Sequence, residues 1–239
     1  YKSKYAENTI AAFQGAIDAG AKCIETDVQL SGDGTVMINH DPRTGRNYDK
    51  DLVIGESTLE ELKQLKNLQD PALRLLTFKE FLEWAVEQPE ETKIMLDIKA
   101  NNSIMVLAVM QRIMLEVKGD LAYWRRKLIF GFWTLEFYEY AYNAGFIYGF
   151  EVINITFSPT IAKRFIEYSL TLPKEFQLRA ISLILVATYA SEFKQLHEEL
   201  MIPNGLDLYL WTLNTQADFD LGYRLDCKSF ITDDPIAAQ

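Results

Sequence analysis

Short apolar runs alternate with amphipathic stretches along most of this chain, and this alternation limits the folds that it can adopt. The strand-like runs lie at 23–30, 93–99, 127–132, 150–157, 180–186, 206–212 and 229–233. Stretches with the 3.6-residue period of amphipathic helices separate them. Asn8 and Thr9 are both expected caps of the first helix, and capping boxes are predicted at Thr58 with Glu61 and at Thr77 with Glu80. Strands that are apolar on both faces and alternate with helices are typical of a parallel sheet covered by helices. The sequence therefore predicts an α/β fold.

The number of strands favours a closed barrel over an open sheet. Residues 35–40 run back after the SGDG turn at 31–34, because four residues are too few for a parallel crossover. Without this returning arm about seven strands remain, one fewer than in a TIM (β/α)8 barrel, and we expect the absent strand to be the first. An open doubly wound sheet is the alternative, but the chain contains neither GxGxxG nor GxxxxGK near its start.

Charge and cysteine content exclude several classes of protein. The formal net charge is −10, which makes the chain a poor binder of nucleic acid and opposes contact with anionic lipid unless a basic patch or bound cation intervenes. Cys23 and Cys227 are too few for a disulfide scaffold, so we expect buried, reduced thiols. No apolar run approaches the roughly 20 residues of a membrane span, and no signal peptide is recognisable.

Acidic side chains interrupt two otherwise apolar strands. Glu25 and Asp27 are two residues apart and therefore share one face, and Asp97 and Lys99 repeat this spacing in KIMLDIK. In a barrel, the functional residues gather at the carboxyl ends of the strands. Three carboxylates there remain ionised together only around a cation, and an all-oxygen donor set favours Mg²⁺ or Ca²⁺ over zinc. The alternative is that each acid pairs with a Lys or Arg.

Further polar and aromatic residues follow the strands. His40 ends the returning arm of the hairpin, which directs it towards Glu25 and Asp27, and imidazole titrates near neutral pH. We therefore expect His40 to act as a general acid or base. Trp211 and Asn214 follow the run at 206–212.

These residues occur within an ordered set of short motifs. They are AENT at 6–9, IETDVQLSGDG at 24–34, NHD at 39–41, LDIK at 96–99, WTLN at 211–214 and ITDDP at 231–235. The set resembles the glycerophosphodiester phosphodiesterase family along the whole chain. In detail the chain is most similar to the fungal branch described as phosphatidylglycerol phospholipase C, through residues 39–58, the motif LDIK in place of LEIK, and ITDDP.

The resemblance implies a domain and a metal site. It implies one barrel domain over 1–239, with a small insertion after the hairpin at about 41–76. It also implies that a divalent metal, Mg²⁺ or Ca²⁺, is held by Glu25, Asp27 and Asp97, where Asp97 stands in place of the commoner Glu.

The resemblance also implies catalytic and substrate-binding residues. Lys99 matches a position that contacts the phosphate, and His40 matches one of two catalytic histidines. The other histidine, followed by Arg, would precede Tyr1, so we expect either that an upstream segment carries it or that this chain lacks one catalytic histidine and is impaired in catalysis. Trp211 is expected to form an apolar wall for the glycerol carbons, or else to pack in the barrel, and Asn214 is expected to bind substrate.

The implied activity is metal-dependent hydrolysis of a glycerol-containing phospholipid, with phosphatidylglycerol giving diacylglycerol and glycerol phosphate. The nucleophile is either water or the glycerol 2-hydroxyl. One alternative is a soluble phosphodiesterase that releases glycerol 3-phosphate from deacylated headgroups. A second is a catalytically inactive lipid-binding barrel, and sphingomyelinase D-like enzymes are a more distant third.

A lipid substrate requires an apolar approach to the site. Residues 123–150 are rich in aromatic side chains, which either pack helices on the barrel or contact acyl chains and the membrane. Trp133, Phe137 and Tyr138 follow a strand and are the expected contacts. The fungal relatives carry a hydrophobic C-terminal tail, so the resemblance implies an intracellular, membrane-associated full-length protein, at the mitochondrion, endoplasmic reticulum or lipid droplet.

Overall fold

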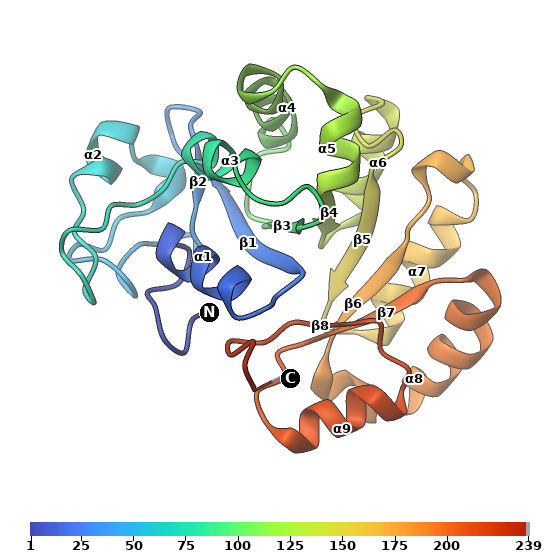
Figure 1. Cartoon of the computed structure of the whole chain (residues 1–239). Helices are drawn as coiled ribbons and strands as arrows, with labels where there is room; N and C mark the ends of the chain where they lie inside the picture. Colours follow the sequence, from blue (N-terminus) through green and yellow to red (C-terminus); the bar gives the residue numbers. More distant parts are fainter. Residues whose placement is uncertain (238–239) are drawn as a thin grey trace. The chain divides into compact units, whose positions relative to one another are not determined.

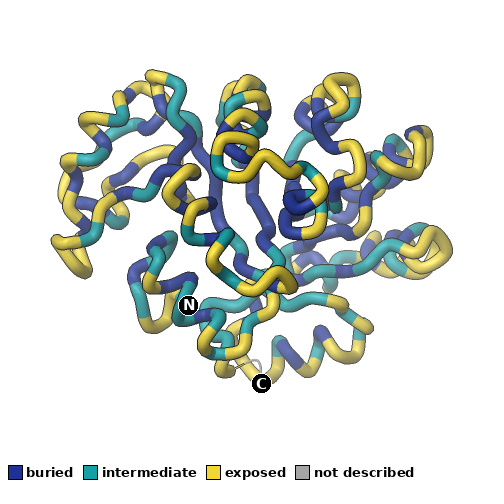
Figure 2. Tube along the Cα trace, turned by 45° about the horizontal axis from the view of Figure 1, so that its top comes forward, coloured by how far each residue is buried: buried dark blue, intermediate teal, exposed yellow. Residues whose placement is uncertain are grey.

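The computed structural model describes residues 1–237, and the chain divides into two compact units, Tyr1–Leu128 and Ile129–Gln239. Strands alternate with helices in both units (Figure 1). The strands are mostly buried, whereas exposed residues concentrate in helices and turns (Figure 2). This is the pattern expected for strands that are apolar on both faces.

The first unit is built on three strands. They are β1 (Cys23–Leu30), β2 (Val36–Ile38) and β3 (Lys93–Ile98). Strand β2 pairs with β1 in antiparallel orientation, which confirms the hairpin predicted from the short SGDG turn. Strand β3 pairs with β1 in parallel, and its register places Asp27 opposite Asp97.

Five helices accompany these strands, and all but α4 begin at a side-chain cap. They are α1 (Ile10–Asp18), α2 (Leu59–Lys63), α3 (Phe78–Val86), α4 (Val106–Val117) and α5 (Leu121–Lys127). The predicted capping boxes, in which Thr58 and Thr77 exchange hydrogen bonds with the glutamate three residues later, are both present. Helix α5 was not predicted, and it begins where the Asp120 carboxylate accepts two backbone N–H groups.

The segment between β2 and α3 forms a small core of its own. Six buried residues make up this core: Met37, Tyr48, Ile54, Leu62, Leu65 and Leu75. A 3₁₀ turn, η1 (Ile54–Glu56), connects this core to the hairpin. The Gly32 N–H of the hairpin turn donates to the Ile54 carbonyl at 3.2 Å and to the Ser57 carbonyl at 2.9 Å. The domain boundaries predicted from the sequence, 1–239 with an insertion at about 41–76, stay a prediction.

Up to residue 237, the second unit contains five parallel strands paired in the order of the sequence. They are β4 (Leu128–Phe132), β5 (Glu151–Thr156), β6 (Ala180–Ile184), β7 (Asp207–Trp211) and β8 (Ser229–Phe230). Strand β6 is shorter than the predicted run at 180–186, because a 3₁₀ turn, η3 (Leu185–Tyr189), replaces its end. Strand β8 likewise ends before the predicted boundary at residue 233.

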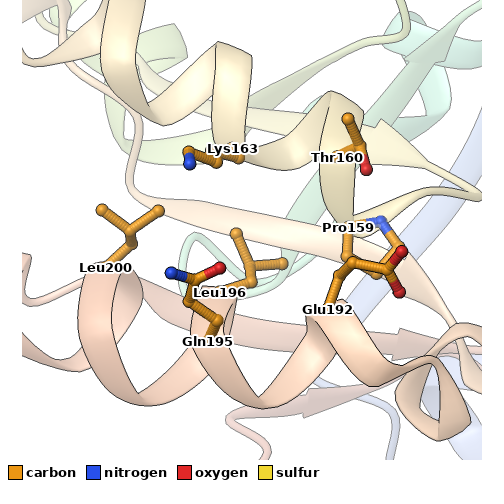
Figure 3. Close-up of a pocket in the computed structure, with 7 residues that line it drawn as sticks. All are labelled: Pro159, Thr160, Lys163, Glu192, Gln195, Leu196 and Leu200. Carbon is orange, nitrogen blue, oxygen red and sulfur yellow. The ribbon is translucent and has the colours of Figure 1, made fainter.

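The helices of the second unit are α6 (Leu135–Asn143), α7 (Pro159–Ser169), α8 (Ser191–Gln195) and α9 (Gln216–Arg224). Shorter turns are η2 (Lys174–Phe176), η4 (Leu196–Met201), which continues α8 as a π-helix, and η5 (Ile202–Asn204). Side chains of α7 and of the α8–η4 segment line a cavity of about 180 Å³ (Figure 3). Among residues 1–237, no helix has the length and apolar character needed to span a bilayer.

The hairpin turn provides a test of how tightly the insertion is held. A Cβ atom on Gly32 would lie 3.0 Å from the Glu56 carbonyl carbon and 3.1 Å from the Gly55 carbonyl oxygen. We expect Gly32→Ala to lower the free energy of unfolding by about 1–3 kcal/mol, because this backbone must shift. Chemical denaturation measures the change.

The matched control is Gly55→Ala, whose new Cβ would meet only the Leu30 carbonyl oxygen, at 3.8 Å. It should change stability by less than about 0.5 kcal/mol. Equal stabilities for the two variants would contradict the close packing of the turn against η1.

Candidate functional site

Three carboxylates meet on the first unit's sheet. Glu25 and Asp27 lie on one face of β1, and the parallel register places Asp97 of β3 beside Asp27. Carboxylate oxygens of these three residues all lie within 4.8 Å of one another. Asp27 and Asp97 are only 5% and 6% exposed, so water does not screen their mutual repulsion effectively.

Lys99 partly compensates this negative charge. Its Nζ lies 2.7 Å from Oδ1 of Asp27 and 2.6 Å from Oδ2 of Asp97. Burial by itself would lower the pKa of Lys99, but the two facing carboxylates outweigh it and raise the pKa above its ordinary value. The ammonium is therefore held in its charged form between the two aspartates.

Glu25 remains without such compensation. Among the described residues, no hydrogen bond or ion pair reaches its carboxylate. Burial raises the pKa of Glu25 well above its usual value of 4.5, and the charges of Asp27 and Asp97 raise it further. Lys99 lowers this pKa, but by less than the opposing effects.

The donor set fits a hard divalent cation. Three carboxylates and one ammonium leave a negative cluster, and Glu25 is the member that the protein itself does not neutralise. Oxygen donors at this spacing are the ligands that Mg²⁺ and Ca²⁺ prefer. The ion pairing of Asp27 and Asp97 with Lys99, which the sequence left open as the alternative, therefore coexists with a candidate metal site.

Asn8 is a site residue that the sequence analysis left without a role. Its Nδ2 donates to Oδ2 of Asp27 at 2.9 Å, and its Oδ1 accepts from the Thr26 hydroxyl at 2.9 Å. Asn8 has φ of 55°, in the left-handed region that Asn tolerates better than most residues. The sequence signal for Asn8 was the AENT motif, in which Asn8 and Thr9 were both expected as helix caps; Thr9 caps α1, and Asn8 contacts Asp27.

His40 follows the returning arm of the hairpin, and its side chain is 53% exposed. Its Nδ1 lies 2.7 Å from Oδ1 of Asp41, and Arg46 in turn pairs with Asp41 and with Glu7. The acceptor at Nδ1 favours the neutral tautomer that carries its proton there, so Nε2 is left to accept a proton. The backbone connects His40 to the acidic cluster, since the Asn39 N–H donates to the Asp27 carbonyl at 3.1 Å.

An aromatic cluster lies at the strand ends of the second unit. The rings of Trp133, Phe157 and Trp211, which follow or end β4, β5 and β7, have centroids 5.0–5.9 Å apart. The Trp211 indole Nε1 is buried, and within residues 1–237 it has no hydrogen-bond partner. Phe157 was missed by the sequence analysis, which stopped the aromatic segment at residue 150.

Two of the expected membrane contacts are corrected by the structure. Phe137 and Tyr138 are 5% and 0% exposed. The Tyr138 ring stacks on Phe165, and its hydroxyl donates to the Phe176 carbonyl at 2.8 Å. These side chains cannot reach a membrane, because α6 directs them inwards.

Asn214 has contacts that hold a loop together. Its Nδ2 donates to Asp233 at 2.9 Å, and its Oδ1 accepts from the Asp233 N–H and the Thr232 hydroxyl. These bonds join the segments that follow β7 and β8. Substrate binding by Asn214 and by Trp211 stays a prediction.

The thiols also differ from expectation. Within residues 1–237, Cys23 and Cys227 form no disulfide, and each is only partly buried, whereas burial was expected. Burial raises the pKa of the Cys227 thiol to about 11, so this thiol is protonated at neutral pH.

Comparison with known proteins relates this chain to one family. The model of the glycerophosphoryl diester phosphodiesterase family matches residues 1–237. A glycerophosphodiester phosphodiesterase of Bacillus altitudinis is 41% identical over 64 residues, which are 27% of this chain and 26% of the relative. The aligned part spans about a quarter to a half of the length of the first curated relatives.

Solved structures show the same fold. A glycerophosphodiester phosphodiesterase from Thermotoga maritima has a TM-score of 0.74 at 24% identity and covers 98% of this chain and 91% of its own. A phosphodiesterase from Oleispira antarctica, solved with the product sn-glycerol-3-phosphate, has a TM-score of 0.77 at 19% identity, with coverage of 99% and 91%. These similarities confirm the predicted α/β fold class, a TIM-like barrel.

The raised pKa of Glu25 leads to a prediction for stability. The folded state binds the Glu25 proton more tightly than the unfolded state does. The favourable contribution of this proton to the free energy of unfolding is therefore lost as pH rises from about 4.5 through the folded-state pKa. In chelator at pH 8, Glu25→Gln should therefore raise the free energy of unfolding, on the order of 1 kcal/mol. Near pH 4 the two proteins should be equally stable.

Urea denaturation at both pH values measures this difference, with Glu60→Gln on the exposed face of α2 as the control. Addition of Mg²⁺ should stabilise the parent protein and leave Glu25→Gln unchanged, because the variant lacks one ligand. A variant less stable than its parent in chelator at pH 8 would contradict the electrostatic account of this cluster.

Proposed function

The chain belongs to the glycerophosphoryl diester phosphodiesterase family, and from this we propose that it hydrolyses phosphodiesters that carry a glycerol group, with Glu25, Asp27 and Asp97 as ligands of a divalent cation. The observation that carries the proposal is the convergence of these three carboxylates within 4.8 Å. Repulsion among buried carboxylates is tolerated where a cation is bound, and it otherwise destabilises the fold.

The cation, Mg²⁺ or Ca²⁺, would supply neutralisation of phosphate charge and a lower pKa for a bound hydroxyl or water. Lys99 places a second positive charge beside the same carboxylates. Its role is to donate hydrogen bonds to phosphoryl oxygens, where charge grows in the transition state. Asn8 acts by position, because its hydrogen bond fixes one oxygen of Asp27.

His40 is the proposed general acid or base. The Asp41 carboxylate orients the ring through Nδ1, which leaves Nε2 to exchange a proton with the nucleophile or the leaving oxygen. Arg46 pairs with Asp41 and is itself paired with Glu7, so the imidazole has a supported position although it is exposed. The nucleophile is either water or the glycerol 2-hydroxyl.

Two classes of molecule are candidates for the substrate. A deacylated glycerophosphodiester is supported by the Oleispira antarctica relative, which was solved with sn-glycerol-3-phosphate as product. Phosphatidylglycerol, cleaved to diacylglycerol and glycerol phosphate, is favoured by the resemblance to the fungal phospholipases C and by the exposed Phe157 of the aromatic cluster. This second candidate also requires association of the protein with a membrane.

Assay of the purified full-length protein against glycerophosphoglycerol and against phosphatidylglycerol vesicles separates these candidates. We expect glycerol phosphate release that stops in chelator and returns with Mg²⁺ or Ca²⁺. Turnover of glycerophosphoglycerol alone would identify a soluble phosphodiesterase, and turnover of the vesicles would identify a phospholipase. No release from either substrate, with metal supplied, would contradict the hydrolase proposal and favour an inactive lipid-binding barrel.

Substitution of His40 tests the acid–base assignment. His40→Gln should lower kcat by about 10²–10⁴-fold, because a positioned proton donor or acceptor is removed. His197→Gln is the matched control, since His197 is the second of the chain's two histidines and lies in η4, where its ring stacks on Phe193. It should retain activity within about twofold. Equal activity of His40→Gln and its parent would contradict the role of this imidazole, provided that calorimetry shows unchanged Mg²⁺ binding.

A further inference from the structure

Four exposed apolar side chains follow two neighbouring strands of the second unit. Phe157 and Ile161 follow β5 and are 61% and 42% exposed, while Val186 and Tyr189 follow β6 and are 65% and 75% exposed. Strands β5 and β6 are parallel, with Thr156 opposite Leu183, so both segments leave the same edge of the sheet. We name these four residues the strand-end patch.

The segments that carry the patch contain no charged residue. None of Asp, Glu, Lys or Arg occurs at 152–162 or at 180–191, although 24% of the whole chain is charged. The first cation after each segment lies near a glutamate one helical turn further on: Lys163 is 3.9 Å from Glu167, and Lys194 is 3.9 Å from Glu198. A surface without charge can enter an apolar phase without the large cost of desolvating an ion.

The patch is supported by ordered structure beneath it. The Phe157 ring packs against Trp133 and Trp211, with centroids 5.0 and 5.3 Å away, so one side is fixed while most of the residue remains exposed. Val186 and Tyr189 project from η3, a 3₁₀ turn in which the Thr188 hydroxyl donates to the Leu185 carbonyl at 2.8 Å. The backbone that carries these side chains is therefore already ordered, which limits the conformational entropy lost when they become buried.

We propose that the strand-end patch inserts into the surface of a phospholipid bilayer. A specific protein interface usually uses about 20–30 residues on each side, many more than this patch offers. A bilayer requires no matching shape, and it accepts a few protruding aliphatic and aromatic side chains, with Tyr suited to the headgroup level. In barrels, the loops after the strands are also those that bind substrate.

Binding through the patch is hydrophobic in origin. The chain's net charge of −10 opposes attraction to anionic lipid, and the patch itself contains no cation. We therefore expect binding to neutral phosphatidylcholine vesicles that changes little between low and high salt. This inference goes beyond the proposed reaction, since vesicle binding is measured without turnover and holds for either substrate.

Sedimentation with phosphatidylcholine vesicles tests the proposal. Val186→Glu places a charge in the patch and should lower the partition coefficient at least about tenfold. Tyr189→Ser removes an aromatic side chain and should lower it by about tenfold as well. Thermal unfolding in the same buffer verifies that each variant is folded.

The matched controls are Ile202→Glu and Tyr223→Ser, at apolar residues of the same unit that are 61% and 63% exposed. Both should bind vesicles within about twofold of the parent protein.

Several results would overturn the proposal. They are failure of the parent protein to bind vesicles, equal binding by the patch variants and their controls, and loss of binding in high salt. A dimer in light scattering that Val186→Glu dissociates would also overturn it, because the patch would then bind a second copy of the chain.

Discussion

The parallel pairing of β1 with β3 is the constraint on which the candidate site depends. Its register places Asp27 beside Asp97, and the period of two along β1 adds Glu25 to the same face. Lys99 neutralises part of the charge of these carboxylates. The backbone hydrogen bonds between β1 and β3, which do not involve the carboxylates, hold the remaining negative cluster in place. The carboxylates are therefore already positioned for a cation before one binds, and their mutual repulsion lowers the stability of the fold while no cation is bound.

The two units use the ends of their strands differently. In the first unit, charged and hydrogen-bonding groups gather there, supported by Asn8 and by the ion pairs around Asp41. In the second unit, the corresponding positions carry Trp133, Phe157 and Trp211 and segments without charge. Barrels permit this division, because the loops after the strands vary without disturbing the packed sheet. Charge suited to a phosphate and apolar surface suited to a lipid can therefore be combined in one fold.

Local patterns predicted much of the fold correctly. The hairpin, the two capping boxes and the α/β class all followed from turn length, capping residues and apolar runs. Helix α5 was missed because its aromatic residues lack a clear amphipathic period, although Asp120 is a usable cap signal. Phe137 and Tyr138 were expected at the surface because they follow a strand, but position along the chain does not reveal which face of α6 is buried.

The sequence by itself determined which residues share a face: the spacing of Glu25 and Asp27 is a property of any strand. It also indicated the family, through the order of its motifs. Only the tertiary structure decided the partner strand and its register, and with them the ion pairs of Lys99 and the hydrogen bond from Asn8 to Asp27. The tertiary structure also decided the exposure of Phe157. The physical reason is that these contacts join segments far apart in the chain, which local periodicity does not relate.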